Sequence, residues 1–347
     1  MSKIALLGDT HFGASKHSEQ VHVYMAKFYK FFFKYLESNS IDNVIQLGDL
    51  YDIRKYVHIS TIKWVNEVFF NPIENNKINL FVIAGNHDVA YKNSNYINSV
   101  SVLCPDSVVV IDIKPETIKI CDTYFDMYPW INVENLDASL KKSKDSSSRF
   151  AIGHFELKGF PMNPGTIAES GMSHTVFANY EQVFSGHFHT ISQRDNIQFT
   201  GTPCELNFSD CSDPKGFWVL DTVTGVKEFI RNPYTLFEKI SYIEDMKYDF
   251  TQVCEKYIKI NIVEKKCQKK FDLFLDNINM NKPHDVKIIE SSISASVNDA
   301  VKMTDLVSTD IMILTFIENL EIDLDKIKLK NHVVELYNEA VTINNTF

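Results

Sequence analysis

The sequence has no long apolar run, no clustered cysteines and no excess of basic residues. No run approaches the roughly 18 residues of a membrane-spanning helix, and the start Met1-Ser2-Lys3 does not resemble a secretory signal. The six cysteines are scattered without a C-x-x-C spacing, which favours reduced thiols in a cytoplasm over disulfides or a zinc cage. The formal net charge of −10 argues at first sight against nucleic-acid binding.

The composition is that of an ordinary globular protein. Hydrophobic residues make up 44% and charged residues 23% of the 347 positions, which excludes a disordered or fibrous chain. This length exceeds what one hydrophobic core usually serves, so we expect a large domain with one or two small appendages.

Five segments share one order of residues: a short apolar run, a glycine, and then a residue that can bind metal. They lie at 4–11, 44–49, 80–88, 150–154 and 183–189. Short continuous apolar runs predict strands buried on both faces. Between the first three, apolar residues recur every three or four positions over 20–38 and 60–76, which predicts helices. This alternation predicts an α/β fold whose sheet contains parallel strand pairs.

The polar residues after these glycines should meet, because ligand sites of such sheets lie beyond the carboxyl ends of the strands. With His87 beside Asn86, the predicted set is Asp9, His11, Asp49, Asn86, His154, His187 and His189. Carboxylate, imidazole and amide groups without thiolate suit manganese, iron or zinc. The set is too large for one ion and fits two ions that share a carboxylate. Such a pair can activate water and hold a phosphoryl group, and it attracts anions whatever the net charge of the chain.

Each motif alone has a plain alternative, because aspartate and glycine are common in turns and short motifs often match by chance. All five in order are a strong signal. The series Gly-Asp-x-His, Gly-Asp-x-x-Asp, Gly-Asn-His-Asp, Gly-His and Gly-His-x-His resembles the calcineurin-like metallophosphoesterases. Within them the chain is similar to SbcD-type nuclease subunits of the recombination and repair exonuclease, above all those of large tailed phages. The resemblance covers residues 1 to about 230 and includes Tyr128-Pro129-Trp130, Gly201-Thr202-Pro203 and Asp213-Pro214-Lys215-Gly216-Phe217-Trp218.

The resemblance implies a two-sheet α/β/β/α sandwich with a small α/β capping domain and C-terminal helices. The implied divisions are a nuclease domain at 1–235, a DNA-contacting capping domain at 236–290 and ATPase-binding helices at 299–347. We expect the strand pairs within 116–127 and 216–230 to supply the second sheet, and 141–148 to be a polar loop. Within 265–270, the basic run Lys265, Lys266, Lys269 and Lys270 indicates either a solvated helix face or a DNA contact.

The resemblance also implies a role for each site residue. Asp9, His11, Asp49 and His189 would hold one divalent ion, and Asp49, Asn86, His154 and His187 the other. Mn²⁺ is the expected metal, with Mg²⁺ as the alternative. His87 would contact phosphate and protonate the leaving 3′-oxygen, and Asp88 would orient it. An activated water would be the nucleophile, and the sequence has no nucleophile-elbow motif.

Four further residues lie near these motifs. Asp52 is either a partner of a metal-binding histidine or a turn carboxylate. Arg54 either contacts DNA phosphates or is simply solvated. We interpret Glu156 as a residue without a role in the site, and Trp130 as a core residue rather than a platform for a base.

These expectations predict a two-metal DNA phosphodiesterase for recombination, repair and replication. It would be a duplex exonuclease, 3′ to 5′, and a single-strand endonuclease in the host cytoplasm. The resemblance implies an SMC-like (SbcC-type) ATPase as partner and a homodimer within a heterotetramer. Amphipathic stretches at 309–320 and 323–341 would bind that ATPase, or would pack on their own domain. The rival functions are a small-molecule phosphatase or phosphodiesterase of the same superfamily, and a scaffold for the ATPase.

Overall fold

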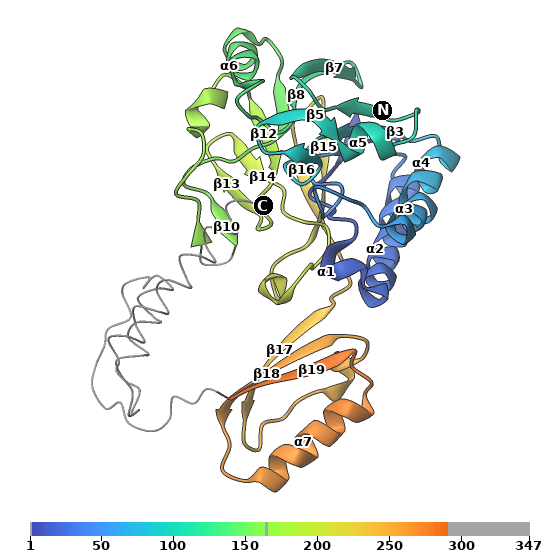
Figure 1. Cartoon of the computed structure of the whole chain (residues 1–347), viewed down its shortest axis with the longest axis vertical. Helices are drawn as coiled ribbons and strands as arrows, with labels where there is room; N and C mark the ends of the chain where they lie inside the picture. Colours follow the sequence, from blue (N-terminus) through green and yellow to red (C-terminus); the bar gives the residue numbers. More distant parts are fainter. Residues whose placement is uncertain (1, 164–165, 291–347) are drawn as a thin grey trace, which may run out of the picture. The chain divides into compact units, whose positions relative to one another are not determined.

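Two six-stranded sheets form the larger part of the chain in the computed structural model, which describes residues 2–163 and 166–290 (Figure 1). The first sheet has the order β16-β15-β1-β2-β3-β6. Its strands are β1 (Lys3–Leu7), β2 (Asn43–Gln46), β3 (Asn79–Ile83), β6 (Val109–Ile111), β15 (Gly216–Asp221) and β16 (Lys227–Arg231). Strands β1, β2, β3 and β6 are parallel. The predicted C-terminal helices of 299–347 lie outside the described residues.

The predicted pair within 216–230 joins the first sheet and not the second, so that part of the sequence prediction is wrong. Strand β15 runs antiparallel to β1, with Ile4 opposite Leu220 and Leu6 opposite Trp218. The physical reason lies in β1, whose Ile4–Leu7 segment is fully buried. A buried strand needs hydrogen-bonding neighbours on both edges, because unpaired buried backbone groups are costly.

The second sheet has the order β13-β14-β12-β9-β8-β7. Its strands are β7 (Glu116–Ile120), β8 (Thr123–Tyr128), β9 (Phe150–His154), β12 (Gln182–Gly186), β13 (Ser192–Arg194) and β14 (Ile197–Phe199). The four central strands are parallel and the two edge strands antiparallel. Here the predicted pair within 116–127 does supply strands of the second sheet.

Alternate residues of each strand face opposite sides of its sheet, and this builds the core. Leu6, Ile45 and Ile83 of the first sheet share one buried cluster with Phe125, Ile152 and Phe184 of the second. Their neighbours Ala5, Val44 and Val82 belong to a different buried cluster, together with the helices. The prediction that these strands are buried on both faces is confirmed.

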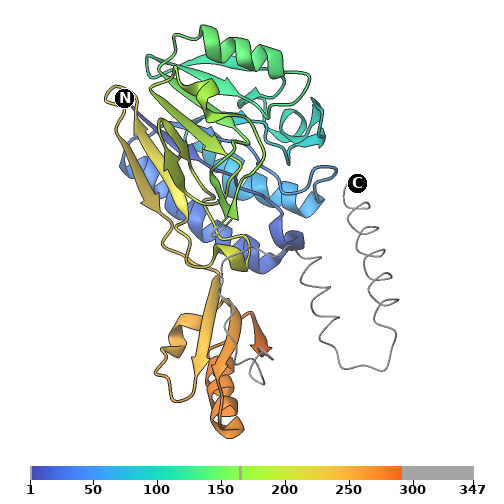
Figure 2. The ribbon, with the colours of Figure 1, turned by 90° about the vertical axis from the view of Figure 1, so that its left-hand side faces the viewer.

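Helices cover the outer face of the first sheet, where α2 lies beside the continuous helical segment that α3, η1 and α4 form end to end (Figures 1 and 2). These helices are α1 (Ala14–His17), α2 (Glu19–Ser38), α3 (Ile59–Val65), a π-helical turn η1 (Asn66–Phe70) and α4 (Asn71–Asn75). In α2, Met25, Phe28 and Phe32 are fully buried at the spacing of one helix face. Among the described residues, no helix has both the length and the apolar character needed to cross a membrane.

The polar stretch at 141–148 is largely helical, contrary to the predicted loop. Helix α6 (Leu136–Asp145) extends through it, and Ser143 is buried with its hydroxyl donating to the Val176 carbonyl. The buried side is therefore polar, which hides the helical pattern from a hydrophobicity argument. The remaining short elements are β4 (Val89–Tyr91), β5 (Ser94–Asn98), α5 (Ser99–Leu103), β10 (Pro161–Asn163), β11 (Thr166–Ile167), η2 (His174–Phe177) and η3 (Phe208–Asp210).

After residue 236 a separate small sheet begins. It consists of β17 (Phe237–Ile243), β18 (Tyr257–Glu264) and β19 (Asp285–Glu290), all parallel, with η4 (Phe250–Val253) and α7 (Gln268–Met280). Helix α7 lies along these strands (Figure 1), and Phe271, Phe274 and Ile278 pack with Ile240 and Ile260 in their own cluster. These strands and helices form a small α/β module.

Candidate metal centre

The carboxyl ends of β1, β2, β3, β9 and β12, with the loops that follow them, bring the predicted polar residues together. Asp9, Asp49 and His154 are at most 2% exposed, which is unusual for charged groups unless they are paired or bind metal. Five strands from two sheets contribute, so the site exists only when both sheets are assembled. The arrangement agrees with the rule that sites of such sheets lie beyond the carboxyl ends of the strands.

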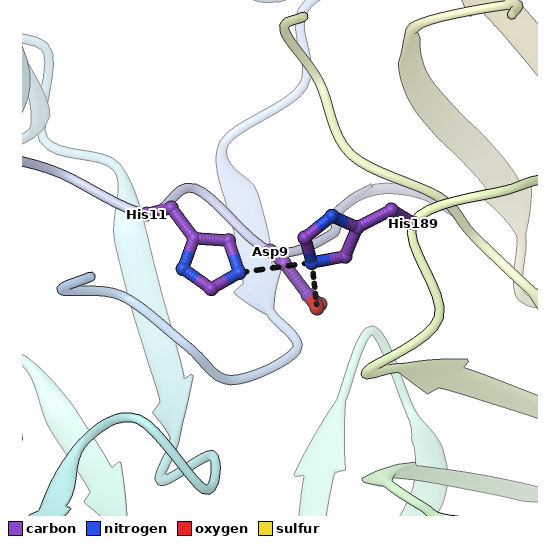
Figure 3. Close-up of side chains that lie close together, drawn as sticks. All are labelled: Asp9, His11 and His189. Atoms are coloured by element: carbon purple, nitrogen blue, oxygen red, sulfur yellow. Dashed lines mark hydrogen bonds and ion pairs between the residues drawn. The ribbon is translucent and has the colours of Figure 1, made fainter. Parts of the chain in front are cut away.

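One group consists of Asp9, His11 and His189 (Figure 3). The Nε2 atoms of His11 and His189 lie 3.1 Å apart, and Nε2 of His189 lies 3.9 Å from Oδ2 of Asp9. One ligand atom from each residue falls within 4.8 Å of the others. Three ligand atoms facing a common point is the arrangement that a bound cation requires.

A second group is centred on the amide oxygen of Asn86. Asn86 Oδ1 lies 2.9 Å from His154 Nε2 and 2.8 Å from His187 Nδ1. Asp49 belongs to both groups, because its Oδ2 lies 3.4 Å from His154 Nε2 and 3.7 Å from His11 Nε2. The structure therefore places the seven predicted ligands in two groups with one carboxylate between them.

The backbone of the site is strained at three of these positions. His11, Asp49 and His187 have φ of 45°, 51° and 83°, a region that costs non-glycine residues about 1–3 kcal/mol each. Hydrogen bonds hold the conformation: the Asp49 carbonyl accepts from His11 N at 3.0 Å, and Asp9 Oδ2 accepts from His187 N at 2.9 Å. Such outliers cluster at functional sites.

Gly48 permits a close approach of the backbone to a candidate ligand. It has a φ of 98°, and a Cβ there would lie 2.4 Å from Nδ1 of His154. The same nitrogen lies 2.8 Å from the Leu47 carbonyl oxygen, which can only accept, so Nδ1 carries the proton. The other nitrogen of His154 is thereby left with its lone pair directed into the site.

The buried carboxylates attract positive charge. Burial opposes protonation of His154, but Asp49 and Asp9 outweigh it and raise its pKa to about 9. Burial and the neighbouring His154 lower the pKa of His187 to about 3, which leaves that imidazole neutral and able to coordinate. Divalent cations would take over the role of the bound protons and displace them. The oxygen and nitrogen donor set, without sulfur, fits borderline-to-hard divalent ions.

His87 lies beside the first group. Its ring meets the ring of His11 edge-on at a centroid distance of 5.0 Å, and its backbone N–H donates to Asp49 Oδ1 at 2.6 Å. The residue that orients the His87 ring is not the predicted Asp88. The ring Nδ1 lies 2.5 Å from the backbone carbonyl of Asp52, so this nitrogen is the protonated one and Nε2 is free.

Asp88 has a different role from the one predicted. It is fully buried, and its carboxylate accepts from the backbone N–H groups of Gly85, Tyr51 and Leu50 at 2.8, 3.1 and 3.2 Å. Among the described residues it makes no hydrogen bond to His87. The carboxylate therefore joins the loops after β2 and β3. A backbone-directed carboxylate satisfies buried N–H groups that sequence patterns do not reveal.

The structure also places the two uncertain residues. Asp52 Oδ1 lies 3.2 Å from Nδ1 of His11, where a partner of a metal-binding histidine is needed. Arg54 is half-buried and lines a cavity with Lys55 and Tyr56. It makes no ion pair with any described residue, and its charge contributes to lowering the pKa of His87, after burial and His11.

Lys215 was not predicted as a site residue, although it lies within the Asp213–Trp218 motif. It is 3% exposed, and its Nζ lies 2.9 Å from each of three acceptors: the backbone carbonyl of His189, Asp213 Oδ2 and Asp210 Oδ1. All three ammonium donors are therefore used. One of them anchors the backbone of His189, so Lys215 contributes to the position of that imidazole.

Comparisons with known proteins give consistent matches. Residues 2–190 match the calcineurin-like phosphoesterase family. The chain is 32% identical over 340 residues to exonuclease subunit 1 of Enterobacteria phage T4. The aligned residues make up 97% of this chain and 99% of that protein. It is 22% identical to the SbcD component of the nuclease SbcCD of Staphylococcus epidermidis, over 74% of this chain and 75% of that protein. It is 26% identical to the DNA double-strand break repair protein Mre11 of Nanoarchaeum equitans, over 63% and 66% respectively.

Proposed function

Because the chain belongs to the calcineurin-like phosphoesterase family, which uses divalent metal ions, we propose that it is a metal-dependent DNA phosphodiesterase. The observation that carries the proposal is the pair of ligand groups that meet at Asp49, with a free histidine nitrogen beside them. The names of three relatives, which denote an exonuclease, a nuclease and a break-repair protein, support DNA as the substrate. A small-molecule phosphatase is not favoured by these relatives.

We assign one cation to Asp9, His11, Asp49 and His189, and a second to Asp49, Asn86, His154 and His187. When bound, two divalent ions offset phosphate charge and activate the attacking water. The protein fixes their positions through strained, hydrogen-bonded loops, so little reorganisation is needed when substrate binds. We propose Mn²⁺ as the native metal, since the mixed oxygen and imidazole set suits it.

His87 is assigned as the group that donates a proton to the leaving oxygen. The Nδ1–H of His87 donates to the Asp52 carbonyl, so Nε2 is the nitrogen that can hold a proton and transfer it to the leaving oxygen. Asp88 positions the loops on which Asp49 and His87 lie. Arg54, half-buried beside His87 and without an ion pair to a described residue, is the candidate contact to a DNA phosphate.

The finer assignments rest on the resemblance of the sequence motifs to SbcD-type nuclease subunits. We propose 3′-to-5′ exonuclease action on duplexes, endonuclease action on single strands, and a role in recombination, repair and replication in the cytoplasm of a bacterial host. Two relatives are named as subunits of larger nucleases, which supports a partner protein for this chain. For that partner we propose an SMC-like ATPase, and for the assembly a homodimer within a heterotetramer. The 236–290 module is assigned as the DNA-contacting capping domain and 299–347 as the ATPase-binding segment.

Two substitutions test this function. His87→Ala should keep the metal content of the wild type and lower the rate of Mn²⁺-dependent cleavage of labelled DNA by about 10²- to 10⁴-fold. Asp49→Ala should lose both metal and cleavage, because this carboxylate faces both groups. His58→Asn is the matched control, since His58 is exposed and caps α3, and asparagine also caps helices.

The outcomes separate the role of His87 from the function itself. Wild-type cleavage rates in His87→Ala would contradict the assigned proton donor and leave the nuclease function in place. A wild-type chain that binds two Mn²⁺ ions and hydrolyses nucleotide monophosphates, while leaving DNA intact, would contradict the function. Metal content is measured by elemental analysis of the purified chain, independently of either rate.

A further inference from the structure

A small cavity adjoins the metal centre on the side of the second ligand group. It has a volume of about 200 Å³ and is lined by Trp130, Ile131, His154, Phe155, Glu156, Gly171 and Met172. His154 is both a wall of this cavity and a candidate ligand, so an occupant of the cavity would lie next to the second ligand group. The size suits one fragment of a substrate, since pockets for drug-sized ligands are larger, roughly 300–1,000 Å³.

Hydrogen bonds anchor the backbone of Trp130 at this position. Its backbone N–H donates to the Ala84 carbonyl at 2.7 Å, and its own carbonyl accepts from the side-chain amides of Asn95 and Asn135 at 2.8 and 3.0 Å. Its ring lies 5.3 Å from the ring of His187 and 6.1 Å from that of His154, centroid to centroid. The side chain is half-buried, and its indole N–H has no hydrogen-bond partner among the described residues.

Glu156 and Met172 form another wall of the cavity. Met172 N donates to the Glu156 carbonyl at 2.9 Å, and Lys158 N donates to the Met172 carbonyl at 3.1 Å, so the two segments are paired. The Glu156 carboxylate accepts one hydrogen bond, from the Ser170 hydroxyl at 2.9 Å. It makes no ion pair with a described residue, and its second oxygen keeps its capacity to accept.

This combination identifies the chemistry of the occupant. A carboxylate repels phosphate at short range, so the cavity is unsuited to the backbone of DNA. An aromatic face binds any nucleobase by stacking, and a carboxylate accepts from exocyclic amino groups such as N4 of cytosine. Trp130 and Glu156, which sequence reasoning interpreted as structural, therefore form a site with the two features that a nucleobase needs.

We propose that the Trp130–Glu156 cavity binds the base of a nucleotide next to the scissile phosphate, with preference for a base that carries an amino group. The proposal rests on the proposed function, because it takes DNA as the substrate. In this proposal the cavity positions the substrate strand relative to the metal centre. The metal ligands alone do not fix that position.

The first experiment compares intact and abasic DNA. In the wild type, removal of the base at one position next to the cleaved bond should lower kcat/KM about 5- to 100-fold, the range expected for one base stacked on an aromatic ring. In Trp130→Ala the same removal should have no effect, because the platform is already lost. Tyr124→Ala is the control: Tyr124 lies on β8, the strand that precedes Trp130, and is 55% exposed, and this variant should keep the wild-type ratio.

The second experiment measures binding without catalysis. Calorimetry with the Mn²⁺-loaded chain should show tighter binding of deoxycytidine monophosphate than of deoxyribose 5-phosphate, and tighter than of thymidine monophosphate by about 10-fold. Glu156→Gln should reduce the difference between the two nucleotides, since an amide both donates and accepts. Trp130→Leu, which keeps an apolar side chain but has no ring, replaces Trp130→Ala if the alanine variant loses metal.

Each result decides the proposal. An abasic penalty that persists in Trp130→Ala, or that is missing at every position near the cut in the wild type, overturns it while the nuclease function stands. Equal affinity of the wild type for deoxycytidine monophosphate and deoxyribose 5-phosphate also overturns it. A wild-type chain that cleaves no DNA would instead contradict the proposed function.

Discussion

Replacement of Lys215 by methionine tests whether a buried ion network supports the metal centre. Lys215 Nζ contacts the His189 carbonyl, Asp213 and Asp210, each at 2.9 Å. Methionine has a similar length and is apolar, so the substitution removes the charge and the three hydrogen bonds with little change in volume. Two buried carboxylates then lose their counter-charge, and the backbone of His189 loses its anchor.

The two losses have separate magnitudes. Removal of one partner from a buried ion pair destabilises a protein by about 3–5 kcal/mol, because the remaining charge is left uncompensated. Loss of a group that positions a metal ligand lowers metal affinity by about 10- to 100-fold. By contrast, Lys27→Met breaks the exposed pair with Glu255, whose side chains are 45% and 61% exposed, and should lower stability by at most about 1 kcal/mol.

Urea unfolding of the metal-free chain measures the first effect, and calorimetric titration with Mn²⁺ measures the second. The double variant Lys215→Met, Asp213→Asn removes one of the two unpaired carboxylates. It should recover part of the stability but none of the metal affinity, because the His189 carbonyl still lacks its donor. Wild-type Mn²⁺ affinity in Lys215→Met would refute the assigned link to His189, whatever the unfolding data show.

Three further predictions use other parts of the structure. Gly48→Ala places a Cβ 2.4 Å from His154 at a φ of 98°, so elemental analysis should find less than the wild-type metal content. Asp126, buried, has its pKa lowered because hydrogen bonds from Ser146, Thr117 and Tyr180 outweigh the effect of burial. Its stabilising effect is therefore complete above the ordinary aspartate pKa of about 4 and is lost as the pH falls below it. Urea unfolding of Asp126→Asn should show a weaker acid dependence than the wild type, and equal slopes would contradict this. Fluorescence anisotropy should show weak DNA binding without metal and tighter binding with Mn²⁺, and equal affinities would refute a metal-based anion site.

The parts of the fold that the sequence predicted are those with a strong local pattern. Strands β1, β2, β3, β9 and β12 each contain a short, buried and mostly apolar run that is followed by a glycine, so burial and strand end are both visible in the sequence. The convergence of their loops followed from the parallel arrangement alone. Among the strands, the predictions that were wrong concern which strand pairs with which. Strand β15 pairs with β1 across more than 200 residues of sequence, and no local pattern specifies that neighbour.

For the site, too, the sequence predicted which residues meet but not which atoms are in contact. Residue types predicted that Asp9, Asp49 and His154 would meet, but not which atom faces which. The true partner of the His87 ring is a backbone carbonyl, a group that every residue carries and that no motif can mark. Tryptophan is also a common core residue, so its type alone does not place Trp130 in the site. Its ring centroid lies 5.3 Å from that of His187, and only this position identifies Trp130 as a wall of the site.

The net charge of −10 illustrates why composition is a poor guide to partners. Within the described residues, six carboxyl-bearing side chains are buried, namely Asp9, Asp49, Asp88, Asp126, Glu205 and Asp210, against one buried lysine, Lys215. Half of the formal excess of negative charge is therefore internal, where it binds backbone N–H groups, hydroxyl groups, Lys215 and the candidate cations. A DNA strand that approaches the chain meets the surface and the metal centre, not the sum of all charges. Two divalent cations bound at Asp49, as proposed, would reverse the sign of the field at the site, so an acidic chain could bind a polyanion there.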